Sequence, residues 1–189
     1  MKASLLFLMV MLLPACNSYH YRIEDYNLTF EPRANSLDVK ATIEITYFMD
    51  GKVSKNDGFK FVGTNEVDSL VCVDETRNLM SKIEYLKETR LSWHFEPVQS
   101  GLKKIKATFL LRNFLEKKGN NYVLKAPWAG VFRVPVSNAR YNILLPATYK
   151  PLQFNDPIKW EHEAPNGKDC YYHNQSPLKD QDIEMLFGE

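Results

Sequence analysis

The sequence predicts an all-β protein, specifically an antiparallel β-sandwich, and three observations lead to this prediction. The clearest is a strict alternation over residues 37–47, where apolar side chains take one face and polar side chains the other. The same period of two recurs over residues 26–30, 91–95 and 105–111. No helix-length amphipathic segment separates these runs. Strands that bury only one face are typical of antiparallel sheets packed face to face.

Turn residues divide the first half of the chain into segments of strand length. The expected breaks lie at residues 32–36, 50–51, 74–78 and 97–101. Asp50-Gly51 is the hairpin type of turn. Between the breaks, short strands are expected over residues 59–62, 67–73 and 83–85.

The second half is more irregular because prolines interrupt it. Phe132, Val134 and Val136 alternate around Pro135, which restricts this run to an edge or bulged strand. Residues 141–145 indicate one more strand with a clear apolar face.

These strands define a sandwich domain over residues 23–146, followed by an extension packed on it over residues 147–189. Prolines and isolated aromatic residues make the extension an irregular tail. Asn166-Gly167 is a further hairpin turn within it. The apolar residues between 178 and 187 indicate one or two turns of a short terminal helix that docks on the sandwich.

The first sixteen residues have the pattern of an export signal rather than of a folded element. Lys2 precedes an uncharged run from Ala3 to Leu13, which stops at a small residue, Ala15. The run is shorter than the roughly 20 apolar residues that a membrane span needs. A charged start, an apolar middle and a small-residue end are typical of a cleaved secretion signal, expected here over residues 1–15.

The motif Leu13-Pro14-Ala15-Cys16 resembles the lipobox of bacterial lipoproteins. The resemblance implies that a diacylglycerol alkylates the Cys16 thiol and that cleavage makes Cys16 the new N-terminus, with residues 16–22 as a lipidated tether. Two or more acyl chains, at about 0.8 kcal/mol for each buried methylene, anchor a protein stably. Asn17 stands where this family's signal for inner-membrane retention has aspartate, which favours the outer membrane. The alternative is an ordinary secretory peptide cleaved near Ala15 or Ser18.

Charge and cysteine content narrow the function further. The net charge of +1 falls to zero without Lys2, so no overall field draws the protein to nucleic acid. If Cys16 carries lipid, Cys72 and Cys170 remain as an even pair in an oxidising compartment. The alternatives for this pair are a Cys72–Cys170 disulfide and two buried free thiols.

Strand patterns over residues 23–146 carry a second resemblance. The motif Tyr26-x-Leu28-x-Phe30, followed by a long alternating strand, is similar to the non-catalytic N-terminal β-domain of M1-type aminopeptidases. With Trp128 and Leu144-Leu145-Pro146, the order of motifs also resembles an uncharacterised extracytoplasmic β-domain of larger bacterial membrane proteins. Both resemblances imply a sandwich that presents a surface or acts as a spacer, without catalysis by this region. The His-Glu-x-x-His zinc motif of the peptidases is absent from the sequence.

The sequence contains no recognisable catalytic or metal-binding constellation. His162, Cys170 and His173 are metal-ligand types, but only Cys170-x-x-His173 has ligand spacing, and surface histidines on a hairpin are the alternative. No Gly-x-Ser-x-Gly elbow or glycine-rich phosphate loop is present. Cys72 lies in an apolar run that disfavours a thiolate. We therefore expect no enzymatic activity, no metal and no cofactor.

Aromatic residues supply the candidate binding surface. Trp128 and Phe132 frame an aromatic loop beside the expected edge strand, and Trp160 lies in the extension. Aromatic faces stack on sugars, and edge strands accept extended peptides by strand addition. The alternative for Trp128 is a core tryptophan that closes one end of the sandwich.

Together these observations predict a non-catalytic binding or assembly module, lipid-anchored to the bacterial cell envelope, that presents a β-sandwich to an envelope protein. A glycan- or peptide-binding surface lipoprotein is the alternative, and an accessory domain of a hydrolase is a weaker one. The expected partners are the membrane, through the N-terminal lipid, and a protein. The sequence names no small-molecule ligand.

Overall fold

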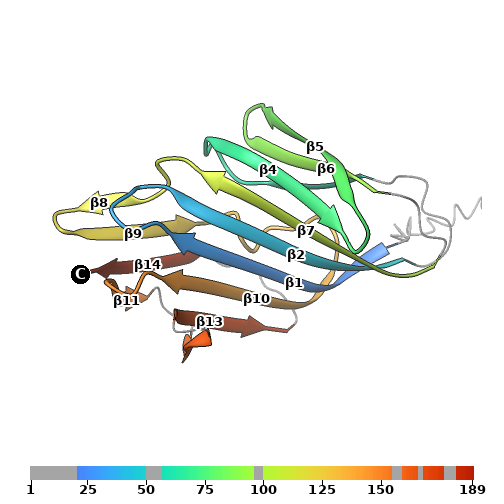
Figure 1. The fold of residues 1–189 in the computed structure, drawn as a ribbon. Coiled ribbons are helices and arrows are strands. Elements are labelled where there is room, and N and C mark those ends of the chain that lie inside the picture. The colour runs from blue at the N-terminus through green and yellow to red at the C-terminus, as the bar shows by residue number, and fades with distance from the viewer. Residues whose placement is uncertain (1–20, 50–56, 96–99, 155–158, 166–167, 177–181) are drawn as a thin grey trace, which may run out of the picture.

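The computed structural model describes residues 21–49, 57–95, 100–154, 159–165, 168–176 and 182–189, which form two β-sheets (Figure 1). In spatial order, the larger sheet contains β12 (Glu161–Glu163), β13 (Asp169–Gln175), β10 (Val136–Leu145), β1 (Tyr21–Pro32), β2 (Val39–Met49), β7 (Gly101–Leu111), β4 (Val67–Asp74), β5 (Asn78–Tyr85), β6 (Thr89–His94) and β3 (Asp57–Phe61). The smaller sheet contains β11 (Lys150–Phe154), β14 (Ile183–Gly188), β9 (Asn121–Ala126) and β8 (Glu116–Lys118).

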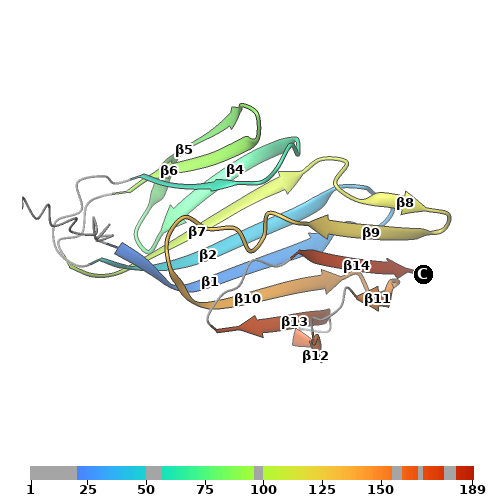
Figure 2. The same cartoon turned by 180° about the vertical axis from the view of Figure 1, so that it is seen from behind.

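The predicted all-β sandwich is confirmed. In β2, Ala41 and Ile43 are buried while Lys40 and Glu44 are exposed, as the alternation requires. The buried faces of β1, β2 and β10 share one core with side chains from β9 and β14. The smaller sheet lies beside the carboxyl end of β1, as Figures 1 and 2 show from opposite sides.

One pair of strands departs from the antiparallel prediction. β10 runs parallel to β1, with Ile23 opposite Val136 and Phe30 opposite Ile143, while β2 pairs with the other edge of β1 antiparallel. A parallel neighbour needs a long connection, and here the chain between β1 and β10 supplies it. Alternation within a strand does not encode the direction of its neighbour, so the mixed sheet could not be foreseen from the pattern.

The prediction of an edge or bulged strand over residues 132–136 is wrong. Residues 127–135 form turns and irregular structure, and β10 begins only at Val136. The carbonyl of Pro135 accepts a hydrogen bond from the Ile23 amide at 3.0 Å, which fixes the end of this segment against the start of β1. Pro135 cannot donate to a strand ladder, and this is consistent with its place outside the strand.

The expected terminal helix is also wrong, because the described part of this region is a strand. β14 lies in the smaller sheet between β9 and β11. Its buried residues Ile183, Met185 and Phe187 recur with a period of two, and Met185 completes the alternation.

The Cys72–Cys170 disulfide is wrong as well, since both cysteines are buried and free. Cys72 lies in β4 and Cys170 in β13, and four strands of the larger sheet separate these two. Five strand spacings of about 4.8 Å each far exceed the roughly 7 Å that a disulfide allows between Cα atoms. The alternative of two buried thiols is what the structure has.

Other expectations concern residues outside the described ranges. The signal over residues 1–15, Cys16 and the turns at 50–51 and 166–167 belong to this group. Within the described chain, the residues after 146 contribute strands to both sheets, with β11 and β14 in the smaller and β12 and β13 in the larger. In the described part of the chain, no helix is long and apolar enough to span a membrane.

Candidate ligand-binding cavity

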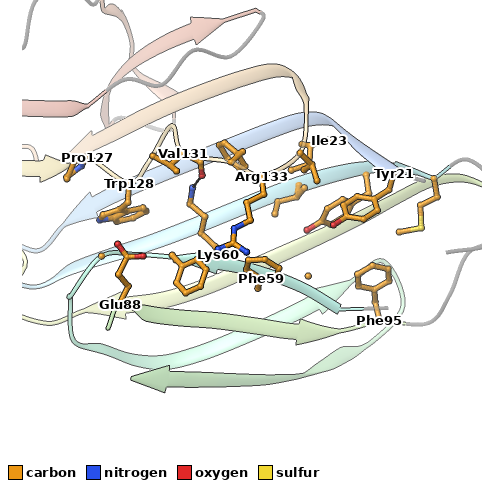
Figure 3. Close-up of a pocket in the computed structure, with 18 residues that line it drawn as sticks. Tyr21, Ile23, Phe59, Lys60, Glu88, Phe95, Pro127, Trp128, Val131 and Arg133 are labelled. Carbon is orange, nitrogen blue, oxygen red and sulfur yellow. Dashed lines mark hydrogen bonds between the residues drawn. The ribbon is translucent and has the colours of Figure 1, made fainter. Parts of the chain in front are cut away.

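An aromatic cavity of about 440 Å³ lies between β3, the start of β1, the end of β2 and the segment that connects β9 to β10 (Figure 3). We name residues 127–135 the connecting segment. Seven aromatic side chains line the cavity: Tyr21, Tyr47, Phe59, Phe61, Phe95, Trp128 and Phe132. Ligand cavities in proteins are typically 300–1,000 Å³ in volume and are lined mainly by such side chains with a few polar groups.

The cavity forms because the β5–β6–β3 end of the larger sheet turns back over the inner face of β1. This places Lys60 of β3 with its ammonium nitrogen 5.6 Å from the centroid of the Tyr26 ring of β1. The smaller sheet covers the other end of the same inner face. Trp128, in the connecting segment just after β9, packs edge-on against Phe30 with centroids 5.8 Å apart. The cavity therefore lies over the part of the inner face of β1 and β2 that neither the smaller sheet nor the folded-back end of the larger sheet covers.

Lys60 is the buried cation of this site and is only 5% exposed. Its ammonium group donates to the carbonyl oxygens of Ala129 at 3.3 Å and Val131 at 2.9 Å. The same nitrogen lies 4.0 Å from the centroid of the Phe132 ring. Hydrogen bonds and an aromatic face thus compensate the buried charge, and the lysine ties β3 to the connecting segment.

Gly58 explains how β3 fits this close to the core. A Cβ at position 58 would overlap the indole of Trp93 on the neighbouring strand β6. Trp93 is 1% exposed and pairs with Gly58 in the β3–β6 register. A glycine inside a strand often marks such a close approach, and here it leaves room for a large ring beneath the cavity.

The connecting segment is held by local turns and by aromatic packing. The Ala129 amide donates to the Ala126 carbonyl at 3.1 Å, and the Val131 amide donates to the Trp128 carbonyl at 3.3 Å. The Phe132 ring meets Tyr26 edge-on, with centroids 4.5 Å apart. The segment is thus a fixed wall of the cavity.

Charged side chains surround the opening. The Arg133 guanidinium lies 5.9 Å from the centroid of Phe59 and 5.8 Å from that of Phe61. The Arg90 guanidinium lies 4.8 Å from the centroid of the Phe59 ring. Glu88 lines the cavity near Trp128, at the end away from Tyr21 and Phe95 in Figure 3. The opening therefore carries both signs of charge around an aromatic interior.

The buried phenol groups of Tyr26 and Tyr47, in and next to the cavity wall, stay neutral. Burial raises the pKa of Tyr26 well above its ordinary value, and the neighbouring Tyr141 raises it further. Burial likewise raises the pKa of Tyr47. Neither group is an ionisable acid or base at physiological pH, so both act in this wall as neutral side chains.

The structure brings together two of the three predicted surface residues. Trp128 and Phe132 both line the cavity. Trp128 also packs in the core as its alternative predicted, being 7% exposed. Trp160 lies elsewhere, stacked on Phe154 with centroids 5.4 Å apart and 6.2 Å from His173.

Sequence reasoning missed the contribution of β3. Gly58 and Lys60 alternate with Phe59 and Phe61, and reading by hydrophobicity alone favours the phenylalanines as the inward residues. The structure reverses this, since Lys60 is buried while Phe59 is 36% exposed. The available signal was the glycine inside a strand pattern, which marks a close approach of neighbouring groups.

The predicted metal-ligand types do not gather into a site within the described residues, where no group of three or more such side chains could hold an ion. His162 Nε2 lies 2.9 Å from Asp169 Oδ1, and His173 Nδ1 lies 3.0 Å from the Lys159 carbonyl oxygen. Burial raises the pKa of the Cys72 thiol to about 11 and raises that of Cys170 as well, which disfavours a nucleophilic thiolate at either position.

Comparison with known proteins gives a likeness of fold. No family model and no curated protein sequence matches the chain. A two-domain M1 zinc metallopeptidase bound to L-tryptophan aligns with a TM-score of 0.59 and 8% identity, covering 89% of this chain and 43% of that one. A mutant M1 zinc metallopeptidase from Deinococcus radiodurans, bound to a Tyr-Ser-Ala substrate, aligns with a TM-score of 0.58, 9% identity, and 89% and 42% coverage. A Legionella pneumophila protein named for nutrient binding aligns with a TM-score of 0.56, 7% identity, and 89% and 67% coverage.

The chain spans less than half the length of the M1 peptidases that it matches. At these identities the likeness is one of fold, and it agrees with the resemblance to the N-terminal β-domain of M1-type aminopeptidases that the strand patterns indicated. The resemblance to an extracytoplasmic β-domain of larger membrane proteins stays a prediction. Fold alone does not fix function, which has to be argued from the cavity.

Proposed function

We propose that this protein is a non-catalytic binding module of the bacterial cell envelope and that the aromatic cavity takes the apolar part of its ligand. The single observation that carries the proposal is the cavity of about 440 Å³ enclosed by β3, β1, β2 and the connecting segment. A well-formed aromatic cavity with few polar groups is the usual form of a ligand site.

The polar groups around the cavity support binding rather than catalysis. Lys60 donates to two main-chain carbonyls, Arg133 lies over aromatic rings, and Glu88 stands at the margin. A nucleophile beside a base would be needed for covalent catalysis, and the described lining residues contain no serine, threonine, cysteine or histidine. The match to less than half of the M1 peptidase length supports the same view.

The envelope location is part of the proposal and rests on the lipobox-like motif that ends at Cys16. A diacylglycerol on Cys16 would hold the module at a membrane, with a short tether before β1 begins at Tyr21. Intact mass measurement on membrane-fraction protein tests this directly. We expect an acylated chain beginning at Cys16, and loss of the acyl mass in Cys16→Ala. An unacylated chain would remove the anchor from the proposal.

The cavity is tested by titrating the full chain with an apolar fluorescent dye, 1-anilinonaphthalene-8-sulfonate. The matched variants are Trp128→Phe, inside the cavity, and Trp160→Phe, stacked on Phe154 elsewhere. We expect energy transfer from tryptophan to bound dye to fall in Trp128→Phe and to persist in Trp160→Phe. Absence of saturable dye binding by the folded chain would contradict a ligand cavity at this place.

A glycan remains the second candidate, because the cavity offers aromatic faces on which sugar rings stack. Seven aromatic residues around one opening favour it. Calorimetric titration with cell-wall oligosaccharides distinguishes it from an apolar ligand. Saturable heat that disappears in Trp128→Ala supports a glycan, and heat that is equal in wild type and variant removes it.

A further inference from the structure

We infer that the ligand is an extended peptide that joins β3 as an additional strand, inserts an apolar side chain into the cavity and presents a carboxylate to Arg133. The inference rests on the proposed function, because it names the ligand class of the same cavity. Three observations carry it: the edge of β3 that no described strand covers, the cavity beside this edge and the Arg133 guanidinium at the opening of the cavity.

The first observation is the direction of the main-chain groups of β3. The Val62 amide donates to the Thr89 carbonyl at 3.0 Å, and this pair continues the register in which Phe61 lies opposite Arg90. In an antiparallel ladder, hydrogen-bonded pairs alternate with pairs that are not hydrogen-bonded. The main-chain groups of Phe59 and Phe61 therefore point away from β6, toward the opposite edge of β3.

No described strand takes up this edge. β3 is the last strand in the order of the larger sheet, and β6 is its sole partner among the described residues. Across the opening, the connecting segment reaches β3 through side chains, namely the Lys60 ammonium and the Arg133 guanidinium. Among the described residues, two amides and two carbonyls of β3 thus have no strand partner, and extended peptides add to sheet edges by pairing with such groups.

The second observation is what an added strand would find on its inner side. Side chains of neighbouring strands share a face when their residues are paired, so a peptide residue beside Gly58 or Lys60 points inward. The inward direction from β3 leads into the cavity, where Phe132 and Trp128 offer aromatic surfaces. One apolar side chain of the peptide therefore has a prepared site.

The third observation is the charge at the opening of the cavity. Arg90 already contacts Glu84, with Nη1 3.4 Å from the carboxylate, whereas Arg133 makes no ion pair with a described residue. Arg133 lies over the rings of Phe59 and Phe61, which alternate with the inward Gly58 and Lys60 and border the opening of the cavity. A residue of an added strand that is paired with Phe59 or Phe61 would therefore point toward Arg133. Charge complementarity selects aspartate or glutamate at that position.

The test uses octapeptides of alternating threonine and valine in which one inward position is leucine, phenylalanine or tryptophan and the next position is aspartate. Binding to the full chain is measured by calorimetry, and hydrogen exchange of the Phe59 and Phe61 amides is followed by mass spectrometry. We expect saturable binding and slower exchange at these two amides. Exchange that does not change on binding would overturn the strand pairing.

Main-chain pairing is isolated by a matched pair of variants. Phe59→Pro removes the outward amide without touching the β6 ladder, and Phe59→Ala removes the same ring but keeps the amide. We expect Phe59→Pro to bind the peptides at least fivefold more weakly than Phe59→Ala. Dye binding by both variants reports that the cavity is intact. Equal peptide affinity in the two variants would overturn the inference.

The peptide itself supplies a control that leaves the protein unchanged. N-methylation of amides on alternate positions gives two peptides, of which one has its blocked amides facing β3 and the other has them facing away. A large difference in affinity supports pairing, and equal affinity overturns it. Replacing the peptide aspartate by asparagine should weaken binding severalfold to wild type and leave binding to Arg133→Gln unchanged.

Failure of the inference and failure of the proposed function give different results. If the dye binds and none of the peptides binds, the cavity stands as a ligand site and the strand-addition inference is overturned. If neither the dye nor any peptide binds to the folded chain, both are overturned.

Discussion

The ammonium nitrogen of Lys60 lies 4.0 Å from the centroid of the Phe132 ring while it donates to two carbonyl oxygens of the same connecting segment. One buried lysine therefore joins the last strand of the larger sheet to the wall opposite it. This contact sets the separation of the two sides of the cavity, because it spans them without any main-chain pairing among the described residues.

Lys60→Met is expected to destabilise the protein by about 3 kcal/mol, since hydrogen bonds from a charged donor contribute roughly 1.5–3 kcal/mol each and the Ala129 and Val131 carbonyls would lose their donor. Urea unfolding measures the change. Lys104→Met is the control, because Lys104 is exposed on β7. Equal unfolding midpoints for the two variants would contradict a structural role for Lys60.

Gly58→Ala is expected to destabilise by about 1–3 kcal/mol, the usual cost of overpacking, because the new methyl would overlap the Trp93 indole. Thermal unfolding and the tryptophan emission maximum report the two consequences. Met80→Ala, at a side chain that is 78% exposed on β5, should change stability by less than about 0.5 kcal/mol. A Gly58→Ala protein as stable as this control would show that the ring moves freely.

Asp74 gives a prediction for pH dependence. Its carboxylate, 1% exposed, lies 2.7 Å from the Lys103 ammonium. This contact, together with donors from Thr76 and Arg77, lowers the pKa of Asp74 well below its ordinary value. A lowered pKa in the folded state stabilises the protein above the unfolded pKa of about 3.9 and loses that effect as pH falls through the folded pKa.

Asp74→Asn should therefore cost about 2 kcal/mol at pH 7. The difference from wild type should shrink as the pH is lowered from about 5 toward 2. Unfolding midpoints measured across this range test the prediction. A difference that is constant with pH would assign the effect to geometry rather than to the charge of Asp74.

The thiols provide a chemical test of the fold. Burial raises the pKa of Cys72 to about 11 and also raises that of Cys170, so both should stay unmodified by iodoacetamide at pH 8 in the folded state. In a Cys16→Ala chain, unfolding without a reductant should then add two labels by intact mass. Labels that appear only after reduction would instead indicate a disulfide.

Periodicity predicted the strands that bury one face. β2 and β7 show this, because their inward residues Ile43 and Ala107 are paired and both are buried. The parallel partner of β1 was not predictable, since pairing of Tyr26 with Ala139 depends on the path of the whole chain between them. The local pattern of residues determines which face of a strand is buried, but it does not determine which strand pairs with it.

The candidate site was predictable only in part, for a related reason. Trp128 and Phe132 stood out as aromatic residues near prolines and turns. Lys60 did not, because a lysine in a strand is ordinarily a surface residue. Its burial depends on carbonyls at Ala129 and Val131, which are distant in the sequence and carry no signal in residue type.

The parallel pairing of β1 with β10 has a consequence for how the molecule comes into being. β1, near the start of the chain, cannot complete its second edge until Val136 to Leu145 has been delivered. Such a topology folds slowly, because chain entropy is spent before the distant pairing forms. During synthesis, β1 would remain unpaired along this edge until β10 is made. Exposed strand edges of this kind promote aggregation, and chaperones counteract it.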